Sequence, residues 1–283
     1  MLKALWMAVA VALSAVVAGC AGGEARPAGE PAREAARPAF LVYETTGRKI
    51  MTDAFDREQE VRLSQRIYAS DKGLRTETKV NVADKAGAVG MVGILRLDRK
   101  LMWQLDPVER TYSEVTFAEA AESVRGVREL LGRRLADEKL SPEQRRGLEV
   151  ALGRRQPKVE VKVDPETVEV LGRRCRHVSY FEDGQLRIEE WAAEDLVIPC
   201  DMSEVRALTG DFSPGLLKEL KGRRSFALKF RIVGRLPASG IPRLSEVEVT
   251  RLERPEKLDP ALFEVPEGYR LAKAVSKTDA KTR

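Results

Sequence analysis

The sequence predicts an α+β protein built on a curved antiparallel sheet of about ten to twelve strands, with helices covering one face of the sheet. Three observations predict this class. Apolar and polar residues alternate from Phe40 onward, turn signals separate the alternating segments, and helical spacing interrupts them at a few places. Alternation marks strands that bury one side and expose the other to water, which suits an antiparallel sheet.

The predicted strands follow one another along the chain. The clearest alternation lies in the segments 61–67, 101–105, 159–163, 226–232 and 247–249. Asp71-Lys72-Gly73 and Asp183-Gly184 predict tight turns between paired strands.

Helical spacing replaces the alternation at four places. Apolar residues recur every three or four positions from Phe117 to about Leu135. A second helix is predicted to begin after Ser141, which can cap it, and two shorter helices cover 202–209 and 214–221. The order of strands and helices therefore places helices over one face of the sheet.

Composition limits the class of protein. The chain has 283 residues, of which 43% are hydrophobic and 33% charged, and its formal net charge is +5. These values exclude a disordered chain, a disulfide-dense miniprotein and a membrane protein with many spans. The single histidine, His177, removes most common catalytic and metal-binding sites. We expect one folded domain over residues 39–272 and a disordered basic tail over 273–283.

Residues 1–19 have the features of a signal peptide. Lys3 supplies a positive charge, and the apolar run from Leu5 to Val17 is too short to span a membrane. The next residues, through Gly19 and Cys20, resemble the lipobox of bacterial lipoproteins. This resemblance implies that the chain is cut before Cys20, and that Cys20 carries a diacylglyceryl group and an N-acyl chain such as palmitate, which together give stable anchoring.

The residues after Cys20 bear on localisation. Ala21 and Gly22 follow it, without the aspartate that retains lipoproteins at the inner membrane of enterobacteria. We therefore expect a lipid-anchored cell-envelope protein at the outer membrane, facing the periplasm. Residues 20–38 form the lipidated N-terminus and a tether that we expect to be disordered, because it contains no residue that could anchor a core.

Two segments resemble a bacterial envelope domain family of unknown function. Leu95–Glu114 resembles the hairpin of that family, and Leu262–Tyr269 resembles its closing strand; the segments around Gly172–Cys175 and Trp191 fit its middle strands. Those proteins are similar to the LolA, LolB and RseB group, whose fold is a half-open β-barrel capped by helices. The resemblance covers about residues 40–272, and it implies this LolA/LolB-like fold without implying any ligand-binding residue.

Cys175 and Cys200 remain after lipidation of Cys20. In an oxidising compartment the two can form a disulfide, which contributes about 3 kcal/mol on the chain-entropy estimate. Two separate buried thiols are the alternative.

His177 belongs to a predicted hairpin. If Asp183-Gly184 is a two-residue turn, His177 faces Glu190 and Cys175 faces Ala192. The His177–Glu190 pair could act as an acid–base pair, but an ordinary cross-strand pair is favoured because spacing places no nucleophile beside it.

Motifs for other chemistry are missing from the sequence. It contains no metal-binding motif, no phosphate-binding glycine loop and no dinucleotide fingerprint. We expect no enzymatic activity, no catalytic residue, no metal and no cofactor.

Basic residues concentrate between Arg125 and Arg155, where nine Lys and Arg stand against five acidic residues. This region is interpreted either as a solvated helical face or as a face that contacts anionic lipid or lipopolysaccharide. The periplasmic compartment disfavours nucleic acid, so no nucleic-acid partner is expected.

Two functional hypotheses follow. The leading one is a non-catalytic lipoprotein that binds a lipid, an acyl chain or another hydrophobic ligand, with Trp103, Phe226 and Phe230 as candidate ligand-facing residues. The alternative is an envelope interaction, sensor or structural protein that docks a protein partner and fills its barrel with side chains. In either case the N-terminal lipid would tie the chain to the membrane.

Overall fold

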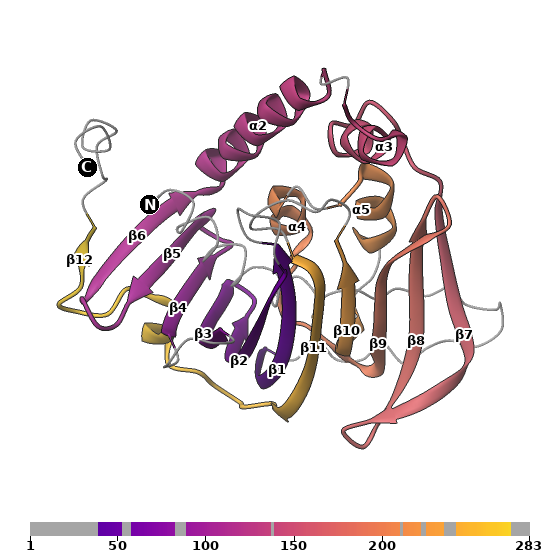
Figure 1. Cartoon of the computed structure of the whole chain (residues 1–283). Helices are drawn as coiled ribbons and strands as arrows, with labels where there is room; N and C mark the ends of the chain where they lie inside the picture. Colours follow the sequence, from indigo (N-terminus) through magenta and orange to yellow (C-terminus); the bar gives the residue numbers. More distant parts are fainter. Residues whose placement is uncertain are drawn as a thin grey trace, which may run out of the picture.

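The computed structural model describes residues 39–52, 58–82, 89–136, 139–209, 212–221, 225–234 and 242–272. Together they form a curved sheet of twelve strands with four α-helices (Figure 1). The strands are β1 (Phe40–Thr52), β2 (Glu58–Ser70), β3 (Gly73–Val82), β4 (Val89–Arg96), β5 (Leu101–Asp106), β6 (Thr111–Thr116), β7 (Val159–Val170), β8 (Arg173–Glu182), β9 (Gln185–Val197), β10 (Ser225–Val233), β11 (Pro242–Glu253) and β12 (Arg270–Leu271).

The sheet is unclosed. Its strand order is β12-β6-β5-β4-β3-β2-β1-β11-β10-β9-β8-β7, so β12 and β7 are its two edges. Neighbouring strands are antiparallel except β12 and β6, which run parallel. The predicted curved, mostly antiparallel sheet with helices is therefore confirmed.

The four helices lie close to their predicted positions. They are α2 (Phe117–Arg134), α3 (Pro142–Ala151), α4 (Ser203–Thr209) and α5 (Pro214–Lys221). Ser141 caps α3 as predicted, since its side chain accepts a hydrogen bond from the Gln144 backbone N–H at 3.1 Å. At the start of α2, the backbone N–H of Thr116 donates to Glu119 and lowers the pKa of that carboxyl below its ordinary value.

Three helices pack on the same face of the sheet, which we call the inner face. Phe117 of α2 and Val205 of α4 join the main core cluster, and Leu216 of α5 joins a second cluster over β8 and β9. On β2 the inward residues are buried and the intervening ones largely exposed, which confirms the predicted alternation. The opposite face is the outer face.

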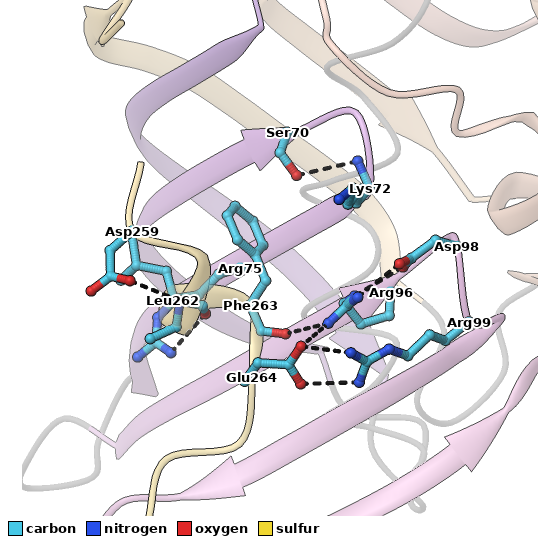
Figure 2. Close-up of polar contacts among 11 residues, drawn as sticks. Ser70, Lys72, Arg75, Arg96, Asp98, Arg99, Asp259, Leu262, Phe263 and Glu264 are labelled. Carbon is cyan, nitrogen blue, oxygen red and sulfur yellow. Dashed lines mark hydrogen bonds and ion pairs between the residues drawn. The ribbon is translucent and has the colours of Figure 1, made fainter. Parts of the chain in front are cut away.

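The C-terminal segment covers part of the outer face (Figure 2). It begins with a 3₁₀ turn, η1 (Pro260–Phe263), and ends in β12. Arg96 of β4 donates to the Phe263 carbonyl at 3.2 Å, forms two hydrogen bonds with Asp98 at 2.9 and 2.7 Å, and pairs with Glu264. The two segments that resemble the family hairpin and its closing strand therefore contact each other.

Trp103 lies beneath this C-terminal segment. Its ring packs with Ile94, Val265 and Tyr269 on the outer face, whereas its neighbour Met102 packs against the main core cluster on the inner face. The grouping of Trp103 with Phe226 and Phe230 as ligand-facing residues is therefore corrected. Alternation shows which residues share a face, but both faces are covered here, so bulk alone does not identify the inward one.

The β8–β9 hairpin differs from its predicted register. Pairing shifts between Tyr180 and Phe181, as at a β-bulge, so that His177 lies opposite Trp191 and Cys175 lies opposite Ala193. The predicted partners Glu190 and Ala192 are wrong by one position, because an extra residue in one strand displaces every pair beyond it.

The predicted signal peptide (1–19), the lipidated Cys20 with its tether (20–38) and the basic tail (273–283) lie outside the described residues. Within the described part of the chain, no helix is long and apolar enough to cross a membrane.

Candidate functional site

Polar side chains interrupt the apolar inner face near the middle of the sheet. Thr45 and Lys49 lie on β1, Gln65 on β2, Thr78 on β3 and Ser245 on β11. Thr45 is opposite Gln65, Gln65 is opposite Thr78, and Lys49 is opposite Ser245. All five are at most 3% exposed. We call these residues the polar band.

The polar band contains hydrogen-bonding atoms without a protein partner. Gln65 Nε2 donates to Thr78 Oγ1 at 2.9 Å. Thr45 Oγ1, Gln65 Oε1 and Ser245 Oγ have no hydrogen-bond partner among the described residues. Leaving a buried polar atom unpaired costs about 1–3 kcal/mol, so native proteins rarely leave several together. These three atoms are available to the polar group of a ligand or to water.

A buried carboxyl lies further along the same face. The Tyr180 hydroxyl donates to Glu190 Oε1 at 2.7 Å, and both residues are almost completely buried. Glu190 lies opposite Phe230 on β10 and Val178 on β8. Glu190, which the sequence paired with His177, therefore belongs to the inner face.

Apolar side chains surround the polar band. Tyr43, one inward position along β1 from Thr45, meets Phe226 edge-to-face with ring centroids 4.9 Å apart. Phe230 packs with Val247, which lies one inward position from Ser245. The inner face therefore combines apolar surface with hydrogen-bonding groups, a combination that suits an amphipathic ligand.

Phe226 and Phe230, two of the predicted ligand-facing residues, thus lie on the inner face. They belong to different clusters, and they are 0% and 5% exposed. In this structure both rings are covered.

Cys175 and Cys200 are both buried in the main core cluster and do not form the predicted disulfide. Burial raises the pKa of Cys175 to about 11. The structure thus shows the alternative arrangement of two buried thiols. The raised pKa keeps Cys175 in the thiol form, whereas the thiolate is the reactive form.

His177 lies on the outer face within a network of side chains. Its Nδ1 is 2.7 Å from Asp164 Oδ2, and its ring stacks on Trp191 with centroids 4.6 Å apart. The Lys229 ammonium lies over the same indole at 5.1 Å. These contacts link side chains of β7, β8, β9 and β10, so His177 takes part in ordinary cross-strand packing.

Metal ligands do not gather in the described residues. No group of three or more His, Cys, Asp or Glu among them could hold a metal ion.

The polar band was not predicted, although the alternation contains a signal for part of it. Gln65 is in phase with Val61, Leu63 and Ile67, and Ser245 is in phase with Val247 and Val249. A polar residue in the buried phase of a strand predicts a buried polar group.

No protein-family model matches the chain, and comparison with curated proteins gives no significant relative. Among solved structures, a DUF1329 family protein from Desulfovibrio piger is 11% identical, with 92% of this chain and 96% of that chain covered and a TM-score of 0.29. A β-barrel-like protein of the domain of unknown function DUF1849 from Brucella abortus is 11% identical, with 77% and 98% covered and a TM-score of 0.30. The chain is also 16% identical to PNGF-II, covering 84% of its own length and 32% of that chain, with a TM-score of 0.29. No fold or function is transferred from scores this low.

Proposed function

We propose that this chain is a non-catalytic lipoprotein of the bacterial cell envelope whose inner face binds an amphipathic ligand with an acyl chain. The observation that carries the proposal is the buried polar band beside an apolar core, in which Thr45 Oγ1, Gln65 Oε1 and Ser245 Oγ find no hydrogen-bond partner in the described part of the chain. A ligand with a polar group and an apolar tail would satisfy these atoms while burying its tail against aromatic and aliphatic side chains.

The ligand's two parts would meet different residues. Its polar group would accept or donate hydrogen bonds at Thr45, Gln65 and Ser245, and the acyl chain would lie toward Tyr43 and Phe226. Those two rings would have to move to admit a chain, because Phe226 is 0% and Tyr43 is 2% exposed.

Two features of the sequence support the proposal. The lipobox-like sequence ending at Cys20 would anchor the chain in the outer membrane, facing the periplasm. The resemblance to the LolA, LolB and RseB half-barrel group fits a domain that handles lipids or partners in that compartment. No catalytic role is proposed, because the described residues place His177 on the outer face and hold Cys175 as a buried thiol.

A second candidate function has its own observation. Phe226 and Phe230 fill the space over their strands, which favours a filled barrel that presents its surface to a protein partner. In that case the half-barrel would be an interaction or sensor module of the envelope.

A titration separates the two candidates. Residues 39–283, stripped of co-purified lipid, are titrated with a lysophospholipid that carries a fluorescent acyl chain. We expect saturable binding, which Thr45→Val combined with Ser245→Ala weakens by about tenfold, since two net hydrogen bonds contribute about 1–3 kcal/mol together. Thr46→Val, at the exposed outward position next to Thr45, should leave the affinity unchanged. Absence of uptake by the unmodified chain would reject the ligand hypothesis and favour the partner hypothesis.

A further inference from the structure

A groove lined by arginines lies between α2 and the end of α3, with a volume of about 590 Å³. We call it the arginine groove. Its lining residues are Arg125, Arg128, Glu129, Gly132 and Arg133 of α2, together with Leu152 and Arg154 beyond α3. Figure 1 shows α3 near the C-terminal end of α2. Four arginines and one glutamate leave the groove strongly positive.

The arginines of this groove differ from those of the sheet. Many described sheet arginines form ion pairs with carboxylates, among them Arg48–Glu246, Arg75–Glu77, Arg96–Asp98, Arg176–Glu194 and Arg231–Glu189. In the groove, Arg125 pairs with Glu122. Arg128, Arg133 and Arg154 have no ion pair with any described carboxylate.

This difference has an electrostatic consequence. Neighbouring guanidinium groups without counter-charges repel one another, and an anion placed among them removes that repulsion. Glu129 offsets only part of the charge. The groove therefore attracts anions more strongly than the paired arginines of the sheet do.

The shape of the groove leaves room for a headgroup. At Gly132 no heavy atom lies within 4 Å of the position that a Cβ would occupy. Arg128 and Arg133 are exposed, so their guanidinium groups can meet a group that approaches from solvent. A guanidinium group binds phosphate oxygens through two parallel hydrogen bonds, so several arginines around an open floor suit a phosphate.

We propose that the arginine groove docks the domain onto the headgroups of anionic phospholipids in the membrane. Charge complementarity selects this occupant, since a bilayer with anionic lipid presents phosphates at the spacing and density that several arginines can engage together. The docked domain would lie with α2 and α3 against the membrane. This inference rests on the N-terminal anchor of the proposed function, which would keep the domain close to the bilayer.

The test uses the full chain, lipidated and inserted into vesicles through its own N-terminus. Leu130→Cys, at a position that is 61% exposed on α2, provides a single reactive thiol for a donor dye, because Cys175 and Cys200 are buried. Energy transfer to an acceptor dye on the lipid headgroups reports how close α2 lies to the bilayer. Vesicles contain phosphatidylcholine either alone or with one third phosphatidylglycerol.

We expect high transfer on vesicles with phosphatidylglycerol, low transfer on phosphatidylcholine, and loss of the difference at high salt. Replacing Arg128, Arg133 and Arg154 by Gln should reduce the ratio of docked to undocked domains on the order of 100-fold, taking roughly fivefold for each arginine near an anionic surface. The matched control replaces Arg62, Arg174 and Arg251 by Gln. These three are exposed on the sheet and carry the same total charge, so this variant should keep the high transfer.

Each other outcome overturns the docking proposal in a recognisable way. Equal loss in both triple variants would show that net charge alone draws the domain to the membrane. Equal transfer on both lipid mixtures would show that the groove does not recognise anionic headgroups. Vesicle flotation separates this failure from failure of the anchor, because an unanchored chain would not float with the vesicles at all.

Discussion

Thr45 and Thr78 offer a matched pair of substitutions for testing the polar band. Both are inward-facing on the sheet, both are 3% exposed, and Thr→Val changes each by replacing a hydroxyl with a methyl group of similar volume. They differ in their hydrogen bonds. Thr78 Oγ1 accepts from Gln65 Nε2 at 2.9 Å, whereas Thr45 Oγ1 has no partner among the described residues.

The two substitutions should change the free energy of unfolding in opposite directions. Thr45→Val removes an unpaired buried hydroxyl, and we expect stabilisation by about 1 kcal/mol in the ligand-free protein. Thr78→Val leaves the buried Nε2 donor of Gln65 without its acceptor, and we expect destabilisation by about 1–3 kcal/mol.

Urea unfolding of lipid-free protein measures both effects. With a slope of about 2.5 kcal/mol per M, the midpoint should rise by about 0.4 M for Thr45→Val and fall by about 0.4–1.2 M for Thr78→Val. A fall for Thr45→Val as large as that for Thr78→Val would contradict this expectation, because it would mean that the protein itself pairs the Thr45 hydroxyl.

Three further predictions follow from the fold. The hydrogen bonds from Arg96 lower the pKa of Asp98. The Asp98 carboxylate therefore stabilises the protein above its ordinary pKa of about 3.9, and this stabilisation is lost as pH falls through the folded-state pKa. In urea unfolding, Asp98→Asn should destabilise the protein more at pH 6 than at pH 3, and equal losses would contradict the pairing. Cys175 is buried and its pKa is raised to about 11, so iodoacetamide should alkylate it at least tenfold more slowly in the native than in the unfolded protein. Mass spectrometry measures the two rates, and similar rates would show an accessible thiol. Trp103→Leu should destabilise by about 1–3 kcal/mol through lost packing beneath the C-terminal segment, with unchanged affinity for the fluorescent acyl probe; a loss of affinity would place Trp103 in the ligand site.

Much of the fold could be predicted because its signals are local. The polar alternation of β2 and the capping serine before α3 each determine structure within a few residues. The predicted pairing partner of His177 was wrong by one residue, because strand register is not determined by local signals alone. The register shift between Tyr180 and Phe181 places one extra residue in β9, and the turn residues Asp183-Gly184 do not mark it.

The candidate site was predictable only in part, for a different reason. The inner-face position of Phe226 and Phe230 was predictable, because bulky residues in a strand usually face a core. Trp103 was not, since the C-terminal segment supplies a second core on the outer face, and that contact joins residues about 160 positions apart. The unpaired state of Thr45 and Ser245 depends on which atoms lie nearby, and alternation carries no information about that.

Native mass spectrometry of the chain released from a bacterial envelope, followed by organic extraction, tests whether the inner face holds a lipid. We expect a stoichiometric amphipathic lipid to accompany the unmodified chain and to be reduced in the Thr45→Val, Ser245→Ala double variant. A clean ligand-free mass, with no lipid in the extract, would contradict binding at the inner face.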